Sequence, residues 1–149
     1  MLKKKFFIVL AVALSAVFFL TIGSLTAMDM PDTITMNSKV FSKHTKNLVT
    51  FHHKKHADNA KISCTDCHHV YKDGKNVWKE GDPVKKCDTC HTKTGKPPKG
   101  MKKAEKIKEY CEYAMHANCK GCHKKMIDKK SPMGKKLRKC SGCHPNKKK

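Results

Sequence analysis

The feature that most constrains this chain is a five-residue pattern, Cys-x-x-Cys-His, that occurs four times between residues 64 and 144. The copies use eight of the nine cysteines: Cys64, Cys67 and His68; Cys87, Cys90 and His91; Cys119, Cys122 and His123; Cys140, Cys143 and His144. Such a pattern can serve a zinc site, a redox dithiol, a disulfide framework or covalent haem attachment. The choice among these chemistries decides the function.

Three of these interpretations leave part of the pattern unexplained. The gaps from Cys67 to Cys87 and from Cys122 to Cys140 suit a four-cysteine zinc ribbon, but a ribbon needs no histidine after each pair. A disulfide framework also accounts for the cysteines alone, and a thioredoxin-like dithiol requires a βαβ pattern that is not visible here. A basic zinc-ribbon nucleic-acid binder is retained as a remote alternative.

Covalent haem attachment explains every residue of the pattern. Both thiols bond to the porphyrin, and the histidine that follows lies beneath the iron as its proximal ligand. Four copies therefore predict four c-type haems, each with one iron. The haems would also supply an interior, because the chain is lysine-rich and has only six Phe, three Tyr and one Trp.

The charge is strongly positive and comes almost wholly from lysine. The formal net charge is +21, from 33 Lys and Arg against 12 Asp and Glu, and Arg138 is the only arginine. Recognition of nucleic acid usually relies on arginine, so we expect no nucleic-acid partner. A diffuse lysine surface favours an acidic redox protein, with residues 120–149 as the expected docking region. The alternative for this region is a solvated basic tail.

Residues 1–27 have the layout of a secretory signal. Three lysines at positions 3–5 precede an apolar run from Phe6 to Ile22, and small residues lead to Ala27. We expect cleavage after Ala27 and export of residues 28–149 to the periplasm. The alternative is an uncleaved anchor, since the run is at the short end for a spanning helix, and membrane contact is expected only in that case.

The remaining pattern predicts a small fold that is mainly α with much irregular structure, wrapped around the haems. The clearest helix is Lys102–His116, where apolar residues recur near one face at Ala104, Ile107, Cys111 and Met115. The other expected elements are a polar lead-in over 28–38, one short strand within 39–50, a helical turn over 54–61, loops over 72–83 and 92–100, and helical pieces beside the last two motifs. A short β-hairpin near the N-terminus is the one further element that this pattern allows.

Two segments resemble a known family. Residues 50–69, TFHHKKHADNAKISCTDCHH, and residues 112–123, EYAMHANCKGCH, are similar to segments of the tetrahaem cytochrome c3 family, the class III cytochromes c of sulfate-reducing bacteria. The resemblance covers residues 39–145, although many members have four residues between the cysteines of the second and fourth motifs. It rests on Phe51, His53 and His56 before the first motif, on His69 after it, and on Tyr110, Tyr113 and His116 before the third.

The resemblance implies four haems that are each ligated by two histidines. By position it pairs His53 with His68, His69 with His91, His56 with His123, and His116 with His144. Such iron has no open position, so the implied role is low-potential electron transfer rather than enzymatic catalysis. The implied partners are a hydrogenase or a membrane redox complex. The nearest rival function is a membrane-anchored tetrahaem quinol dehydrogenase.

Alternatives stay open for the second ligand beside the first motif and for Cys111. His52 adjoins His53, and only the resemblance favours His53 as the ligand. Cys111 has no partner among the cysteines; we expect it buried beside a haem, with a link between two molecules or a reactive thiol as alternatives. His44 is expected at the surface.

Overall fold

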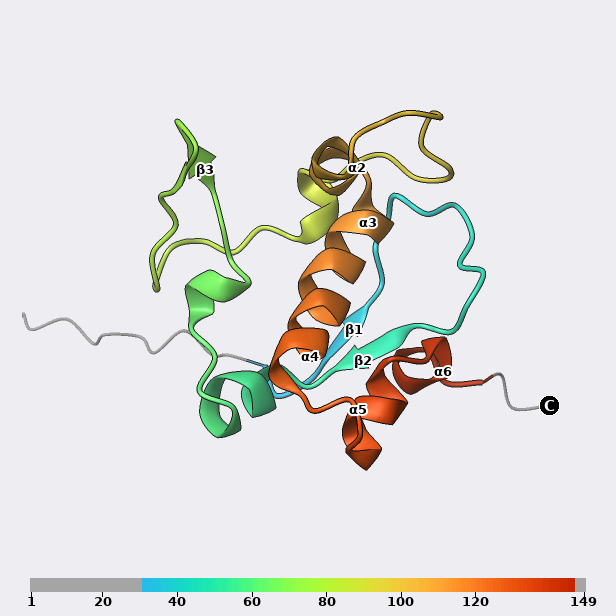
Figure 1. Cartoon of the computed structure of the whole chain (residues 1–149). Coiled ribbons are helices and arrows are strands. Elements are labelled where there is room, and N and C mark those ends of the chain that lie inside the picture. The colour runs from blue at the N-terminus through green and yellow to red at the C-terminus, as the bar shows by residue number, and fades with distance from the viewer. Residues whose placement is uncertain (1–30, 147–149) are drawn as a thin grey trace, which may run out of the picture.

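The computed structural model describes residues 31–146 of the chain, so the signal segment expected at residues 1–27 lies outside the described residues (Figure 1). The strands are β1 (Ile34–Met36), β2 (Val49–Phe51), β3 (Tyr71–Lys72) and β4 (Lys75–Asn76). The helices are α2 (Lys103–Glu109), α3 (Cys111–Met115), α4 (Gly121–Met126), α5 (Pro132–Leu137) and α6 (Cys140–Cys143). Four short turns complete the set: η1 (Lys55–Asn59), η2 (Cys64–Asp66), η3 (Cys87–Thr89) and η4 (His116–Lys120).

A helical column through the middle of the molecule organises this fold. Helix α3, the π-helical turn η4 and helix α4 follow one another without a break from Cys111 to Met126 (Figure 1). Helix α2 lies at one end of the column, α5 and α6 lie near the other, and the β3–β4 hairpin forms a separate lobe. The fold is mainly α with much irregular structure, as predicted, and no helix within residues 31–146 is long and apolar enough to cross a membrane.

The expected N-terminal hairpin is present, but only one of its two strands overlaps the predicted strand region. Strands β1 and β2 pair antiparallel, with Ile34 opposite Phe51 and Met36 opposite Val49. Strand β1 falls in the segment predicted to be a polar lead-in, and β2 runs past the end of the predicted strand region. A strand of three residues is too short to show a clear alternation of apolar and polar side chains. Such strands are therefore identified by their pairing in the structure and not from the sequence.

The predicted single helix over Lys102–His116 is wrong, because the helix breaks at Tyr110. The Tyr110 backbone is extended, with φ −98° and ψ 122°. The break exposes backbone groups that pair with the loop after the second motif: the Lys93 N–H donates to the Glu109 carbonyl at 3.0 Å, and the Cys111 N–H donates to the Lys93 carbonyl at 3.0 Å. Burial of the Tyr110 ring, which is 7% exposed, also favours the break.

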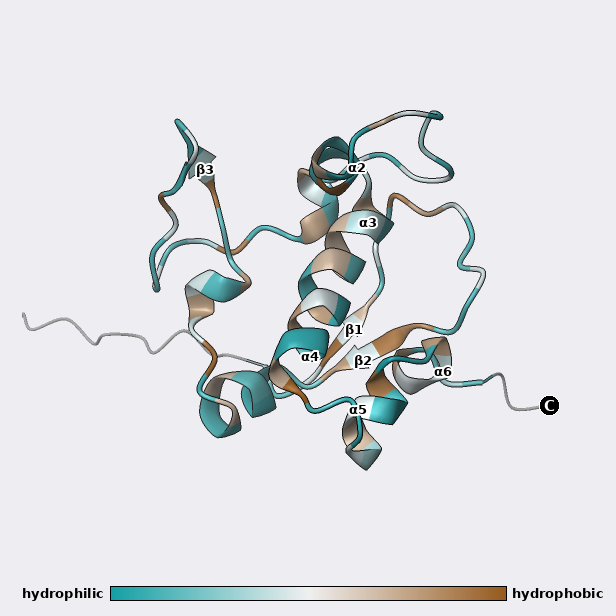
Figure 2. Ribbon diagram, viewed as in Figure 1, coloured by the Kyte–Doolittle hydropathy of each residue, from teal (hydrophilic) through white to brown (hydrophobic). Residues whose placement is uncertain are grey.

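The apolar core is very small. Among residues 31–146 the buried hydrophobic side chains are Trp78, Tyr110 and Cys111. Figure 2 shows brown only in short stretches, including β2, with teal and white between them. Cys111 is fully buried, as expected; its thiol lies 3.4 Å from the Ser38 hydroxyl and 3.7 Å from the Met115 sulfur, and burial raises its pKa. A chain with so few buried side chains needs another source of cohesion.

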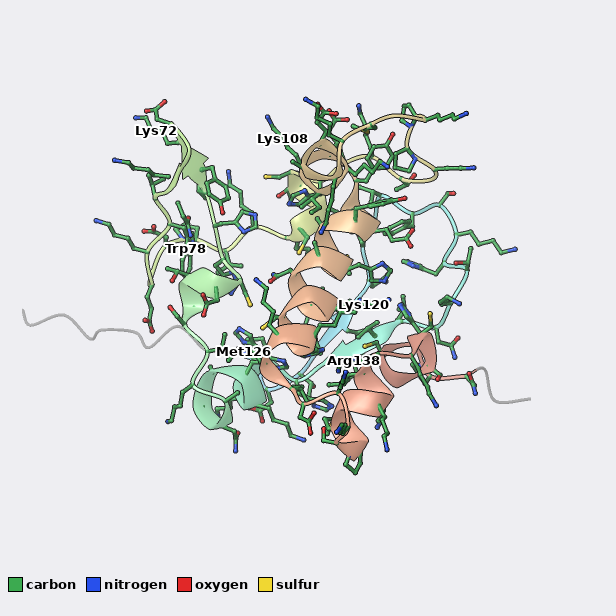
Figure 3. All side chains as sticks on the ribbon, in the orientation of Figure 1. Lys72, Trp78, Lys108, Lys120, Met126 and Arg138 are labelled. Atoms are coloured by element: carbon green, nitrogen blue, oxygen red, sulfur yellow. The ribbon has the colours of Figure 1, made fainter. Side chains whose placement is uncertain are left out.

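The only arginine of the chain serves to join helices. The Arg138 guanidinium donates to the carbonyl of Gly134 at 3.2 Å, of Lys124 at 3.3 Å and of Ile127 at 3.4 Å. The last two carbonyls lie at the C-terminal end of α4, where carbonyls lack helical partners. Arg138 therefore fastens α4 to α5, and Figure 3 labels it beside these helices.

Replacing Arg138 with lysine is expected to destabilise the haem-loaded protein by about 1–2 kcal/mol, because a compact ammonium cannot reach three carbonyls in the fork geometry of a guanidinium. Thermal unfolding measures the change. Lys136→Gln on the exposed surface of α5 is the control and should leave the midpoint within error. Equal midpoints for both variants would contradict the role assigned to Arg138.

Candidate haem sites

Each Cys-x-x-Cys-His motif is folded as a single helical turn. The histidine N–H donates to the carbonyl of the first cysteine at 2.8 Å for His68, 2.9 Å for His91 and 2.8 Å for His144. The third motif lies within the helical column, across η4 and α4. Residues i, i+3 and i+4 share one face of a helical turn, so both thiols and the imidazole of a motif lie on one side.

The structure brings together all four histidine pairs that the resemblance implies. The ring centroids are 6.1 Å apart for His53 and His68, 6.0 Å for His69 and His91, 6.0 Å for His56 and His123, and 6.4 Å for His116 and His144. Metal–imidazole bonds are about 2 Å long, so two imidazoles on opposite sides of one metal have centroids about 6 Å apart. Each pair therefore has the spacing that one iron between two rings requires.

The second ring nitrogen of several of these histidines is already bound to the protein. The Nδ1–H of His56 donates to the His52 carbonyl at 2.8 Å. The Nδ1–H of His91 donates to the Lys108 carbonyl at 3.0 Å, and that of His144 donates to the Asn47 carbonyl at 2.8 Å. Histidines that bind a metal usually donate their other N–H to a carbonyl or carboxylate in this way, which leaves Nε2 for the metal. The donor set thus fits haem iron with two histidine ligands.

Burial keeps two of the motif histidines in the form that binds metals. It lowers the pKa of His68 and of His123, and the facing imidazole of each pair, His53 or His56, lowers it further. Both shifts favour the neutral imidazole, which is the form that ligates iron.

The four motifs converge in space. Burial, as the largest cause, raises the pKa of Cys119 to about 11, and the thiols of Cys67, Cys87 and Cys143 add to this rise. These three cysteines come one from each of the other motifs, so thiols of all four motifs lie close enough to interact. Cofactors attached at such motifs lie near one another.

Comparison with known proteins identifies the family. The sequence model of the class III cytochrome c family matches residues 30–144. The chain belongs to this family. A cytochrome c3 of Maridesulfovibrio salexigens is 36% identical over 123 residues, which span 81% of this chain and 100% of that protein. A cytochrome c3 of Desulfovibrio desulfuricans is 30% identical over 122 residues, or 79% of this chain and 98% of that protein. This chain is accordingly a multihaem c-type cytochrome of electron transport.

Two π-helical turns of this class III cytochrome carry histidines that face a motif histidine. Turn η1 contains His56, and turn η4 begins at His116. The Phe51 ring at the end of β2 lies against two of the rings, with centroids 5.8 Å from His53 and 4.6 Å from His56. Turns of this kind occur often at functional sites, because the extra residue re-aims a side chain.

The two histidines outside the pairs lie apart from this arrangement. His52 is exposed, and its carbonyl rather than its ring contacts His56. The His44 Nε2–H donates to the Asn37 amide oxygen at 3.1 Å. Of the two neighbours left open by the sequence, His53 is thus the one whose ring faces His68. In residues 31–146, no three His, Cys, Asp or Glu side chains gather as a separate metal site.

Sequence reasoning missed the residues that tie the N-terminal segment of the cytochrome to the motifs. The Asp88 carboxylate, inside the second motif, accepts from the Lys39 N–H at 2.7 Å and from the Ser38 hydroxyl at 3.0 Å. These bonds, with that of Lys39 the larger, lower the Asp88 pKa. The Asn47 carbonyl holds His144. Backbone carbonyls occur in every residue, so no sequence signal marks Asn47, and an aspartate between two motif cysteines has no distinctive pattern either.

Proposed function

We propose that this cytochrome carries four c-type haems, each ligated by two histidines, and transfers electrons in the periplasm. The proposed ligand pairs are His53 and His68, His69 and His91, His56 and His123, and His116 and His144. The observation that supports them most strongly is the set of centroid separations between 6.0 and 6.4 Å. The cysteines of the four motifs are the proposed attachment points.

The chain's part in this function is to hold and space the cofactors. Bound haem supplies one-electron redox chemistry. Two imidazoles would hold each iron and leave it no open position, which favours electron transfer over substrate binding. His68 and His69 are consecutive in the chain yet belong to different pairs, so the backbone itself limits the distance between two of the haems. Short distances favour rapid exchange of electrons within the molecule.

The first test is the intact mass of the chain isolated from a host that exports proteins and attaches haem. We expect the mass of residues 28–149 plus four haems, and low-spin iron only in the electron paramagnetic resonance spectrum. Four haems on an uncleaved chain would contradict signal cleavage and favour the membrane-anchored quinol dehydrogenase. A haem-free chain with bound zinc would overturn the proposal as a whole.

An acidic redox protein, such as a periplasmic hydrogenase or a membrane redox complex, is the proposed partner, and it docks near residues 120–149. Every lysine within residues 120–146 is exposed, and Asp128 is the one acidic residue in that stretch. Arg138 is half-buried and its guanidinium is hydrogen-bonded to carbonyls, so the exposed cationic groups of this surface are lysines. Positive charge at this density accelerates association with an acidic surface.

Reversing two of these charges, in the double variant Lys135→Glu and Lys136→Glu, is expected to slow electron transfer with an acidic redox partner about tenfold at low salt. The difference should shrink as salt is added, because exposed charges are screened. The control is Lys72→Glu with Lys75→Glu, which changes the net charge equally on the β3–β4 hairpin. Stopped-flow kinetics measure both, and an equal loss in the two double variants would contradict a docking surface near the fourth motif.

A further inference from the structure

The only tryptophan of the chain lies against a motif histidine with its polar atom unsatisfied. The ring centroids of Trp78 and His68 are 4.9 Å apart, with an angle of 31° between the ring planes. Trp78 is 6% exposed, and its Nε1 is buried without a hydrogen-bond partner among residues 31–146. Buried indole N–H groups normally have an acceptor, because leaving one unpaired costs about 1–3 kcal/mol.

A hairpin fixes the position of Trp78. Asp73 and Gly74 both have positive φ, 50° and 75°, as a tight turn between β3 and β4 requires. The Asn76 amide oxygen accepts from the Val70 N–H at 3.0 Å and from the Trp78 N–H at 3.1 Å, and its amide nitrogen donates to the His68 carbonyl at 3.1 Å. The hairpin is therefore bound to the backbone of the very histidine on which Trp78 lies.

Burial of Trp78 is specific to that side chain within the hairpin lobe. Its apolar neighbours Val70, Tyr71 and Val77 are 46%, 66% and 45% exposed. Figure 3 labels Trp78 in this lobe, with Lys72 near its tip. The lobe thus buries the indole and leaves these other apolar side chains largely exposed. The contact with His68 is therefore the main packing contact of the lobe.

Neither the facing His68 ring nor the Asn76 side chain offers the missing acceptor. An imidazole that binds iron through one nitrogen carries a proton on the other, so His68 can only donate. The Asn76 amide oxygen already accepts two backbone N–H groups. The haem proposed between His53 and His68 brings two carboxylates, and ionised carboxylates are the stronger class of acceptor.

We propose that Trp78 is a positioning residue for the haem held by His53 and His68: its indole N–H donates to one carboxylate of that haem, and its ring fixes the plane of His68. The inference rests on the proposed function. Donation offsets part of the carboxylate's negative charge, which otherwise favours the oxidised, more positive iron. Trp78 thereby raises the reduction potential of this haem, since hydrogen bonding around a haem is one of the protein's means of tuning it.

Nuclear magnetic resonance of the haem-loaded protein with ¹⁵N-labelled tryptophan tests the contact directly, because a chain with one Trp gives one indole signal. In the fully reduced, diamagnetic protein we expect hydrogen exchange of the indole N–H at least tenfold slower than in a free indole. We also expect nuclear Overhauser effects from this N–H to the propionate methylene protons of the haem on His68. Fast exchange, or effects to protein protons alone, would overturn the proposal.

Trp78→Phe gives a second readout, because it keeps an aromatic ring beside His68 and removes the N–H. We expect the equilibrium constant for one-electron reduction of that haem to fall roughly three- to tenfold, with the other three unchanged. Lys72→Gln at the hairpin tip is the control and should shift none of them. Unchanged potentials in the Phe variant would contradict the proposal, and if that variant fails to assemble, the resonance data on the unaltered protein decide. Fewer than four haems in the intact mass would instead count against the proposed function.

Discussion

Replacing Gly142 with alanine is expected to destabilise the haem-loaded protein by about 3 kcal/mol or more, whereas the same change at Gly121 is expected to be tolerated. Both glycines occupy the residue before the second cysteine of a motif. A Cβ at Gly142 would overlap the Lys136 carbonyl oxygen and would lie 2.8 Å from its carbonyl carbon and 3.3 Å from the Leu137 nitrogen. These are backbone atoms of α5, which cannot rotate away as a side chain could.

The change at Gly142 should also impair attachment of the fourth haem. If α6 is pushed away from α5, the whole fourth motif, Cys140, Cys143 and His144, is displaced as one unit. His144 then moves away from the Asn47 carbonyl that orients its ring. We expect a fraction of molecules with three haems, measured by intact mass, together with a lower thermal unfolding midpoint.

Gly121→Ala is a closely matched control, because Gly121 occupies the same position in the third motif as Gly142 does in the fourth. A Cβ at Gly121 meets no atom within 4 Å, and alanine is favoured over glycine in a helix by about 1 kcal/mol. Gly121→Ala should therefore keep four haems and match or exceed the stability of the unaltered protein. If Gly142→Ala behaved in the same way, α6 could not pack on α5 as closely as the Gly142 contacts require.

Replacing His53 with methionine is expected to raise the reduction potential of one haem by on the order of a few tenths of a volt, within the range of about 0.8 V that axial ligands span. The His53 ring faces His68 with centroids 6.1 Å apart, and methionine can supply a sulfur ligand at the same place. Thioether sulfur stabilises reduced iron relative to imidazole. Redox titration followed by visible spectroscopy should show one haem separated from the other three.

The neighbouring residue provides the matched control for that change. His52 is exposed, and its backbone carbonyl rather than its side chain holds His56. His52→Met should leave all four potentials in place and the haem count at four. A shift caused by His52→Met, with none from His53→Met, would reverse the proposed ligand assignment.

Much of the candidate site could be read from the sequence because its chemistry is local. Each of the four five-residue motifs is helical in this structure, and residues at this spacing share one face of a helical turn. The pairing of distant histidines is different. Composition and spacing left His52 and His53 equal, and it was the resemblance to a family that named the pairs. The structure then brings His53 rather than His52 to face His68.

The helix break at Tyr110 shows where sequence reasoning fails for the fold. Apolar periodicity runs through Tyr110 without interruption, and nothing local requires the helix to stop. Lys93, a residue far back in the chain, takes the hydrogen bonds that the break releases. Local propensity is a weak preference, and tertiary pairing of this kind overrides it.

By itself, the sequence determined the haem-attachment chemistry, the mainly α class and the positive charge, because these depend on residue type and on spacings of a few residues. Only the tertiary structure decided which carbonyls orient the histidines, that Arg138 joins two helices, that Gly142 has no room for a side chain and that Trp78 lies on His68. Each of these depends on atoms that are distant in the chain and meet only after folding. The burial and the hydrogen-bond partners of a residue depend on the atoms around it in the folded protein, so the residue type alone does not determine them.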